Sequence, residues 1–469
     1  MITLLIIIIL IRTIKFKPKN EEMYFKEEVD IDKDIAIRNL QEMIKCKTIS
    51  NIDSSLEDND EFLKFEKLLQ KLYPNIYKTC EFIKVSERSL LYKWKGLKSD
   101  KPTVLMAHYD VVPCDYEGWE KDPFAGIIEN DVLWGRGTLD TKGTVNGILS
   151  SVEHLIANSF TPTNDIYIAL GGNEEVSGDG QIKIIEYFNN NGIKVNMVLD
   201  EGGAVVENVF PGVKEKCAVI GTGEKGFASI KLEINENGGH ASTPKPNGAI
   251  SQLSKACLEI ERKPFKQNIS KPARQMFDTL GRKSTFLYRM IFANLWLFKG
   301  LLNLICIKSG GELNALTRTT TAFTQMSGSD ATNVLPVKAS ITINNRINTG
   351  ETVESTKEYI KKVIKNDNIN VDVLQCSNPS NISEVDCNEW NMLKKAIKST
   401  WNETIVTPYL MIACSDSRHY SKICDKVYRF SGMFLTSQER KSIHGNNEKI
   451  PLNTILENVE FYTRLIKQL

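Results

Sequence analysis

Five short segments of the chain end in side chains that bind metal ions well. They supply His108, Asp140, Glu175, Asp200 and His444. Two metal ions that each take one imidazole and one carboxylate, and that share a further carboxylate, need a set of this kind. Nitrogen and oxygen ligands without a thiolate are typical of catalytic zinc sites, which keep a coordination position open for water and substrate. The pattern therefore predicts a site for two zinc ions.

Carboxylates beside these ligands are left over for chemistry. Asp110 follows His108 by two residues, so both side chains share one face of a strand end, and Asp110 can orient the imidazole. The adjacent Glu174 and Glu175 repel each other unless cations hold them together. Because their side chains diverge, we predict that Glu175 binds metal and that Glu174 is the general base. Glu201, next to Asp200, is a weaker ligand candidate.

Basic side chains further along the chain are candidates for substrate contact. His240 follows two glycines, and its imidazole could stabilise an oxyanion or be an ordinary surface histidine. Arg346 ends a predicted strand and could hold a substrate carboxylate through paired hydrogen bonds. Residues 221–226 fit a dinucleotide-binding glycine pattern, but an alternating strand follows them instead of a helix, so we interpret them as a hinge.

Short apolar strands are expected to position the metal ligands. Hydrophobic runs at 103–107, 165–170 and 195–199 predict buried strands, and amphipathic helices are predicted at 145–156 and 181–189. Open α/β sheets bind ligands at the C-terminal ends of their strands. The polar residues at or just beyond these ends are His108, Glu174, Glu175 and Asp200. We therefore predict an α/β catalytic domain with a mixed, mostly parallel sheet.

The pattern changes near residue 223, where strands begin to alternate as half-buried strands do. The elements predicted there are strands at 227–234, 315–324, 338–346 and 369–374 and helices at 250–260 and 353–364. Their order is β-α-β-β-α-β, which is typical of a ferredoxin-like domain. We therefore predict that a lid (223–377) interrupts a catalytic domain made of residues 30–222 and 378–469.

The N-terminal segment is strongly apolar. Residues 1–11 are followed by Arg12, Lys15, Lys17 and Lys19. This apolar run of eleven residues is shorter than the about 20 residues that a spanning helix needs. We predict that residues 1–19 are a signal or anchor segment, and that the protein enters the secretory pathway and reaches a vacuolar or lysosome-like lumen or stays membrane-anchored. A cytoplasmic location is the alternative.

Residues 286–307 form another apolar stretch, which charged side chains interrupt. A transmembrane span is rejected here because each charge at the bilayer centre costs about 2.5–3.5 kcal/mol. Helices that cover the lid are the favoured interpretation. A wall for an apolar substrate and a contact with a membrane surface stay open as alternatives.

The bulk composition excludes several functions. The chain has 469 residues, and its 59 Lys and Arg nearly balance its 58 Asp and Glu, so no overall field favours nucleic acid as a partner. The ten cysteines include no C-x-x-C pair, which argues against a zinc-thiolate site or a redox motif.

Taken together, the motifs resemble the aminoacylase/carboxypeptidase S family of dizinc metallopeptidases, and its carboxypeptidase S branch most closely. The resemblance extends from about residue 30 to the C-terminus. The matching stretches are 108–113, 119–124, 135–143, 173–178, 200–203, 238–242, 333–336, 415–420 and 443–445.

This resemblance implies a role for each candidate residue. The implied zinc ligands are His108 with Asp200 on one ion, Glu175 with His444 on the other, and Asp140 between them. The other implied roles are Glu174 as base, Asp110 behind the ligand histidine, His240 as oxyanion contact, and Asn333, Arg346 and Ser415 as substrate contacts. It also implies a cis peptide bond after Asp140, and a homodimer in which the lid histidine reaches the partner subunit's site.

The predicted function is zinc-dependent hydrolysis of an amide bond beside a free C-terminal carboxylate in short peptides. Hydrolysis of N-acyl amino acids would use the same metals and stays open. An inactive binding protein is a distant alternative, because neither the base nor any ligand is missing. Ala413 and Cys414 stand where the family tends to have small, glycine-rich residues, which implies a narrower pocket for the substrate carboxylate.

Overall fold

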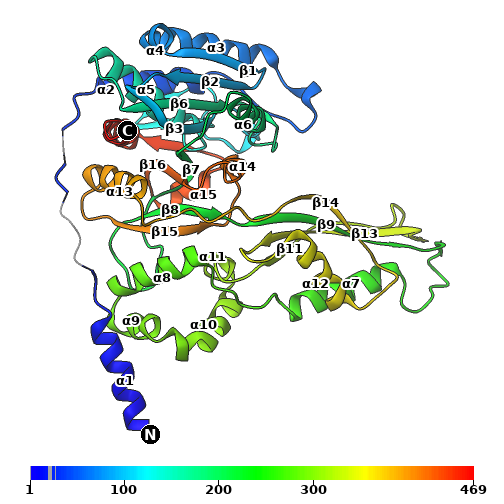
Figure 1. The fold of residues 1–469 in the computed structure, drawn as a ribbon. Helices are drawn as coiled ribbons and strands as arrows, with labels where there is room; N and C mark the ends of the chain where they lie inside the picture. The colour runs from blue at the N-terminus through cyan, green and yellow to red at the C-terminus, as the bar shows by residue number, and fades with distance from the viewer. Residues whose placement is uncertain (1, 20–23, 27) are drawn as a thin grey trace.

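Two large β-sheets organise the chain in the computed structural model, which describes residues 2–19, 24–26 and 28–469 (Figure 1). The larger sheet has eight strands in the order β1-β2-β6-β3-β7-β16-β8-β15. The inner pairs β6–β3, β3–β7 and β7–β16 are parallel, and β1–β2 and β2–β6 are antiparallel. The strand bounds are β1 Glu81–Ser86, β2 Ser89–Trp94, β3 Lys98–His108, β6 Asn164–Gly171, β7 Met197–Val206, β8 Cys217–Glu224, β15 Ile405–Met411 and β16 Val427–Leu435. The predicted mixed α/β fold is confirmed.

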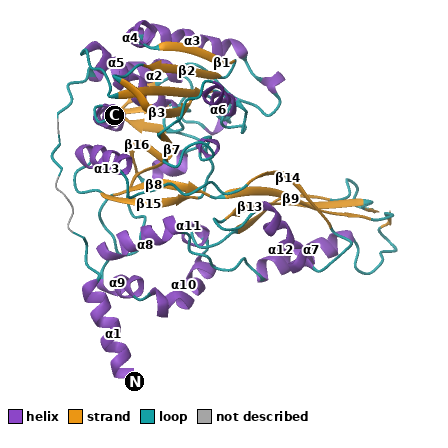
Figure 2. Cartoon of the chain, viewed as in Figure 1, coloured by secondary structure: helices purple, strands orange, loops and turns teal. Residues whose placement is uncertain are grey.

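Helices cover both faces of this sheet (Figure 2). Side chains alternate along a strand, so Leu105 faces a core shared with helix α5 (Lys142–Ala157), whereas Val104 faces the opposite core and α6 (Gly180–Asn190). The other covering helices are α2 Lys33–Ile44, α3 Asn59–Leu72, α13 Asn388–Thr400 and α16 Leu452–Ile466. Burial on both faces explains why these strands are continuous apolar runs.

The second sheet forms the lid and extends away from the larger one (Figure 1). Its four strands are antiparallel in the order β11-β13-β9-β14. The lid elements are β9 Gly226–Asn235, α7 Ala249–Arg262, β11 Thr320–Ser327, β13 Lys338–Ile347, α12 Val353–Ile364 and β14 Asn370–Ser377. This is the predicted β-α-β-β-α-β order, with a hydrophobic cluster of its own. The strand predicted from residue 315 begins only at Thr320, because Leu316 and Thr317 still close helix α11 (Gly311–Ala315).

Lys225 marks the passage from one sheet to the other. The predicted hinge is in fact strand on both sides of it, since β8 ends at Glu224 and β9 begins at Gly226. The Lys225 ammonium is buried and donates to the carbonyl oxygens of Ala315 (2.9 Å) and Arg318 (2.8 Å). Burial lowers the pKa of Lys225 to about 7. These hydrogen bonds fix the connection between the two sheets to the segment around residues 315–318.

The apolar stretch at 286–307 does not cover the lid, and that interpretation was wrong. Helices α8 (Lys271–Lys283), α9 (Phe286–Ala293) and α10 (Leu295–Ser309) pack below the catalytic sheet, where Phe277 and Phe292 contact Phe210. Among the described residues no single helix is long and apolar enough to cross a membrane. The bent pair α9–α10 meets that test by length and composition, with 110° between its helices.

We predict that Ile343→Ala destabilises the lid by about 2–5 kcal/mol, because Ile343 is fully buried in the lid cluster and its loss leaves a cavity. Urea unfolding followed by circular dichroism measures the change. Met326→Ala, at a position on the neighbouring strand that is 69% exposed, is the matched control and should change stability little. Equal effects of both substitutions would contradict the assignment of this core.

Candidate metal centre

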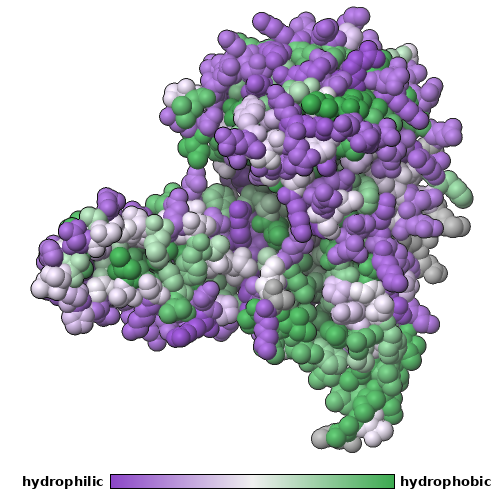
Figure 3. Space-filling view, turned by 180° about the vertical axis from the view of Figure 1, so that it is seen from behind, coloured by the Kyte–Doolittle hydropathy of each residue, from purple (hydrophilic) through white to green (hydrophobic). Residues whose placement is uncertain are grey.

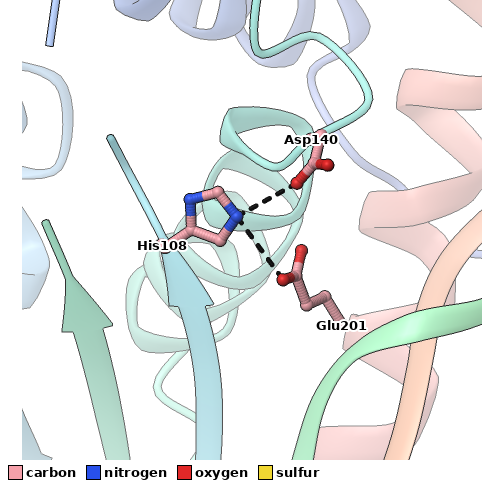
Figure 4. Close-up of side chains that lie close together, drawn as sticks. All are labelled: His108, Asp140 and Glu201. Carbon is pink, nitrogen blue, oxygen red and sulfur yellow. Dashed lines mark hydrogen bonds and ion pairs between the residues drawn. The ribbon is translucent and has the colours of Figure 1, made fainter. Parts of the chain in front are cut away.

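Strand β3 ends at His108, whose two ring nitrogens face different groups. Nδ1 lies 3.0 Å from the backbone oxygen of Asp110 and 3.3 Å from its Oδ1. Nε2 lies 3.0 Å from Asp140 Oδ1 and 3.4 Å from Glu201 Oε1 (Figure 4). With Nδ1 held by Asp110, Nε2 is the nitrogen that can bind a metal ion. The geometry thus places Asp110 where the sequence predicted it.

A second group of ligands meets at the other oxygen of Asp140. His444 Nε2 lies 3.0 Å from Asp140 Oδ2 and 3.1 Å from Glu175 Oε2. His108 and His444 therefore face opposite oxygens of one carboxylate. The residues form two clusters of ligand atoms, one of His108, Asp140 and Glu201 and one of Asp140, Glu175 and His444.

Glu201, the neighbour of the predicted ligand Asp200, lies with the other candidate ligands. Asp200 Oδ2 accepts a hydrogen bond from the Ser417 backbone nitrogen (3.1 Å), whereas the Glu201 carboxylate points at His108. Strand β7 is irregular here: Asp200 pairs with Arg429, and the next pair joins Gly203 to Phe430. The residues between them leave the regular ladder, so side-chain alternation no longer predicts which one faces the site. The geometry favours Glu201 over Asp200 as the ligand.

The chemistry of the donor set fits a pair of divalent cations. Glu175 Oε1 is buried without a hydrogen-bond partner, which leaves a ligand oxygen free. Burial raises the pKa of Glu201 to about 8, although His108 opposes the shift. Burial, together with the Asp416, Glu201 and Glu175 carboxylates, raises the pKa of Glu174 well above its usual range. So much buried negative charge in one place is what a metal ion would neutralise.

Glu448 holds the loop that presents Asp140. Its carboxylate accepts hydrogen bonds from the backbone nitrogens of Gly137 (3.1 Å), Leu139 (2.7 Å) and Asp140 (3.2 Å), and it pairs with Arg136 at 2.6 Å. The peptide bond between Asp140 and Thr141 is cis, as expected. Sequence reasoning missed Glu448, because nothing in the sequence marks it as a buried carboxylate.

Asp110 also aligns the turn that carries the paired glutamates. Its carboxylate accepts from Ser50 Oγ (2.7 Å) and from the backbone nitrogens of Glu174 (3.2 Å) and Glu175 (3.1 Å). One buried carboxylate therefore fixes both the ligand ring and the residues proposed as ligand and base.

The predicted substrate contacts do not all lie at this site. Arg346 Nη1 lies 3.5 Å from Cys414 Sγ, at the end of the lid next to the catalytic domain. Ser415 is fully buried, and its hydroxyl donates to Glu224 (2.8 Å). The geometry therefore does not favour Ser415 as a substrate contact. His240 and Asn333 lie on neighbouring segments joined by a backbone hydrogen bond from Ala241 to Asn333.

The turn that carries His240 is exposed and belongs to the small β10–β12 sheet of the lid (β10 Gly239–His240, β12 Val334–Leu335). The hydrogen bonds found for the His240 ring among the described residues are to its neighbour Ser242, with Nδ1 2.6 Å from the Ser242 hydroxyl. The structure therefore does not bring His240 or Asn333 together with the metal ligands of the same chain.

Two histidine–carboxylate groups that share one aspartate, with a spare glutamate alongside, define a metal-dependent hydrolase site at the C-terminal edge of an α/β sheet. The comparison with known sequences agrees: residues 104–468 match peptidase family M20/M25/M40, and the chain belongs to this family. The predicted recognition as a metallopeptidase is confirmed.

Individual relatives carry two kinds of name. The chain is 33% identical over 477 residues to "Probable carboxypeptidase S-like 2" of Dictyostelium discoideum, covering 99% of this chain and 92% of that protein. It is also 33% identical over 478 residues to "N-fatty-acyl-amino acid synthase/hydrolase PM20D1" of Xenopus tropicalis, covering 99% and 93%. In structure it resembles the M20 family metallo-carboxypeptidase Sso-CP2 of Sulfolobus solfataricus, with a TM-score of 0.66, 18% identity and coverage of 92% and 98%.

We predict that Glu201→Gln lowers the metal content by about one ion per chain, because it removes a charged ligand from one group. Asp200→Asn should keep most of the metal, since an amide oxygen can still accept the bond from Ser417. Elemental analysis of the purified, metal-reconstituted proteins shows whether Glu201 or Asp200 is the metal ligand. Metal loss in the Asp200 variant alone would restore the original assignment.

Proposed function

We propose that this protein is a zinc-dependent hydrolase that cleaves an amide bond beside a free C-terminal carboxylate in short peptides. The observation that carries the proposal is the placement of Asp140 between His108 and His444, with Glu174 next to the ligand Glu175. Two zinc ions held by these residues and Glu201 would polarise the substrate carbonyl and lower the pKa of water to about 7.

The remaining chemistry falls to the protein's own side chains. The Glu174 carboxylate accepts a proton from the attacking water and returns it to the leaving nitrogen, so the amide bond breaks without releasing an unstable anion. Burial raises the pKa of Glu174, which makes its carboxylate a stronger base than a solvated one and suits it to take up that proton. Asp110 keeps the neighbouring backbone in place.

Arg346 is the proposed partner of the substrate carboxylate. Its guanidinium lies at the boundary between lid and catalytic domain, and the side-chain hydrogen bond found for it among the described residues is to the weak acceptor Cys414 Sγ. A guanidinium forms paired, charge-assisted hydrogen bonds with a carboxylate much more strongly than with a thiol. The bulk of Cys414 beside it supports a narrow pocket.

Hydrolysis of N-acyl amino acids is the second candidate. It is favoured by the relative named as an N-fatty-acyl-amino acid synthase/hydrolase, which is as similar to this chain as the relative named as carboxypeptidase S-like. Both reactions present the same amide and carboxylate to the site, so the difference lies in the acyl side of the substrate.

His240 is proposed to stabilise the oxyanion, and Asn333 to contact substrate, in the site of a second subunit. Their exposure on the lid supports this role, because a homodimer formed through the lid would bring them to a partner.

The N-terminal helix α1 (Ile2–Lys15) is proposed as the signal or anchor segment of a protein of the secretory pathway, on the strength of its exposed aliphatic side chains.

A panel of dipeptides and N-acyl amino acids, each with a free or an amidated C-terminus, tests the substrate class. Free-carboxylate dipeptides should be cleaved in the presence of Zn²⁺, and amidation should abolish cleavage because Arg346 loses its partner. Arg346→Met should raise KM for the free acids more than it lowers kcat. Efficient cleavage of the amidated substrates would refute the role of the carboxylate.

We predict that Glu174→Gln lowers kcat about 10²–10⁴-fold while metal content stays unchanged, because the substitution removes the proton acceptor and keeps the shape. Glu175→Gln is the matched control on the adjacent residue and should lose metal as well as activity. Turnover numbers and elemental analysis are measured on the same preparations. A Glu174 variant with nearly full activity would exclude it as the base.

A further inference from the structure

One lobe of the molecule is apolar on its surface, and it is built from α1 together with α9 and α10. Figure 3 shows it as a continuous hydrophobic region at the end of the molecule where the N-terminal helix projects. Most large aliphatic and aromatic side chains of these helices are exposed, among them Ile2, Leu4, Leu287, Trp296, Leu301 and Leu304. Trp296 is 56% exposed and Leu287 is 62% exposed. Exposed apolar surface gathered in this way marks an interaction site.

Specific hydrogen bonds join the two segments of the lobe. The Arg12 guanidinium donates to the carbonyl oxygen of Ala293, at the end of α9, with distances of 3.2 and 3.3 Å. Asn294 Nδ2, between α9 and α10, donates to Thr13 Oγ1 at 3.3 Å, and Thr13 is fully buried. Segments 281 residues apart in sequence therefore present one surface.

The two segments that form the lobe carry charges of a single sign. Residues 2–19 and 283–309 contain no Asp or Glu, although acidic and basic residues balance in the whole chain at 58 and 59. The cations in these segments include Arg12, Lys15, Lys17, Lys283, Lys299 and Lys308. Apolar side chains next to unopposed cations complement the acyl chains and the anionic headgroups of a lipid surface.

The helices of the lobe suit contact with a bilayer surface better than passage through it. Helix α1 has 14 residues, which gives about 21 Å at 1.5 Å per residue, less than the hydrocarbon core of about 30 Å. Helices α9 and α10 meet at 110°, so they do not form one straight span. Lys299 lies in the middle of α10 and is exposed, where it can reach the headgroups beside the apolar tip.

We propose that α9 and α10 form, together with α1, a docking surface for anionic lipid bilayers. This goes beyond an N-terminal anchor, because it places membrane contact in a segment inserted between α7 and β11, far from α1 in the sequence. It does not depend on the reaction that the metal centre catalyses. The docked enzyme would have a fixed orientation, with α9 and α10 at the lipid and the catalytic sheet above them.

Co-sedimentation of the full chain, with α1 shown to be intact by mass, tests the apolar contact. The probes are vesicles of phosphatidylcholine with and without phosphatidylserine. Trp296→Glu combined with Leu301→Glu should lower the affinity for the anionic vesicles about tenfold or more. Phe323→Glu with Met326→Glu, at exposed positions on lid strand β11, is the matched control and should bind as the wild type does.

The charged contact is tested with a second pair. Lys299→Glu with Lys308→Glu should abolish the preference for anionic vesicles, whereas Lys255→Glu with Lys362→Glu on α7 and α12 should keep it. Unchanged hydrolysis of a small soluble substrate shows that each variant is folded. Equal vesicle binding by the α10 variants and the wild type would overturn the proposal. The proposal would also be overturned if the wild type does not bind vesicles but self-associates through this lobe in sedimentation velocity. The surface would then bind a second copy of the chain.

Discussion

The Asp140 carboxylate faces two histidines, one on each oxygen, and much of the surrounding structure keeps it in this orientation. Its oxygens lie 3.0 Å from His108 on one side and 3.0 Å from His444 on the other. A carboxylate has only one plane, so the backbone that carries it needs a fixed orientation. Glu448 supplies that orientation through hydrogen bonds from three backbone nitrogens of the loop, and it comes from the same C-terminal segment as His444.

Buried charges play the same part elsewhere around the site. Glu224 accepts from Arg429, Ser415 and Ser417, and thereby joins the last residue of β8 to β16 and to the loop after β15. The Lys142 ammonium, at the start of α5, donates to the carbonyl oxygens of Met43, in the last turn of α2, and of Cys46, just after that helix. Buried ion pairs add little net stability, yet losing one partner is strongly destabilising. Their effect here is to fix where strand ends and loops meet.

Hydrophobic patterning predicted the elements that carry the site, because a strand buried on both faces forms a short continuous apolar run. It placed His108 and the paired glutamates at strand ends, and the structure keeps them there. It could not distinguish Asp200 from Glu201, because an irregular strand breaks the alternation of side chains there. It also misjudged α9 and α10, since an apolar segment packed on a lid and one exposed on a surface have the same composition. Such differences depend on contacts between distant segments.

The length of the lid limits which of its residues can serve one site. Strands β9 and β13 pair along their whole length, from Arg346 opposite Phe227 to Lys338 opposite Asn235. Eight residue steps of about 3.3 Å separate these ends by roughly 26 Å. Arg346 stands at the end next to the catalytic domain, whereas His240 and Asn333 follow beyond the other end. A lid that moves as one body cannot bring both to one scissile bond. If both act in catalysis, they act in different sites, and the second site must belong to another subunit.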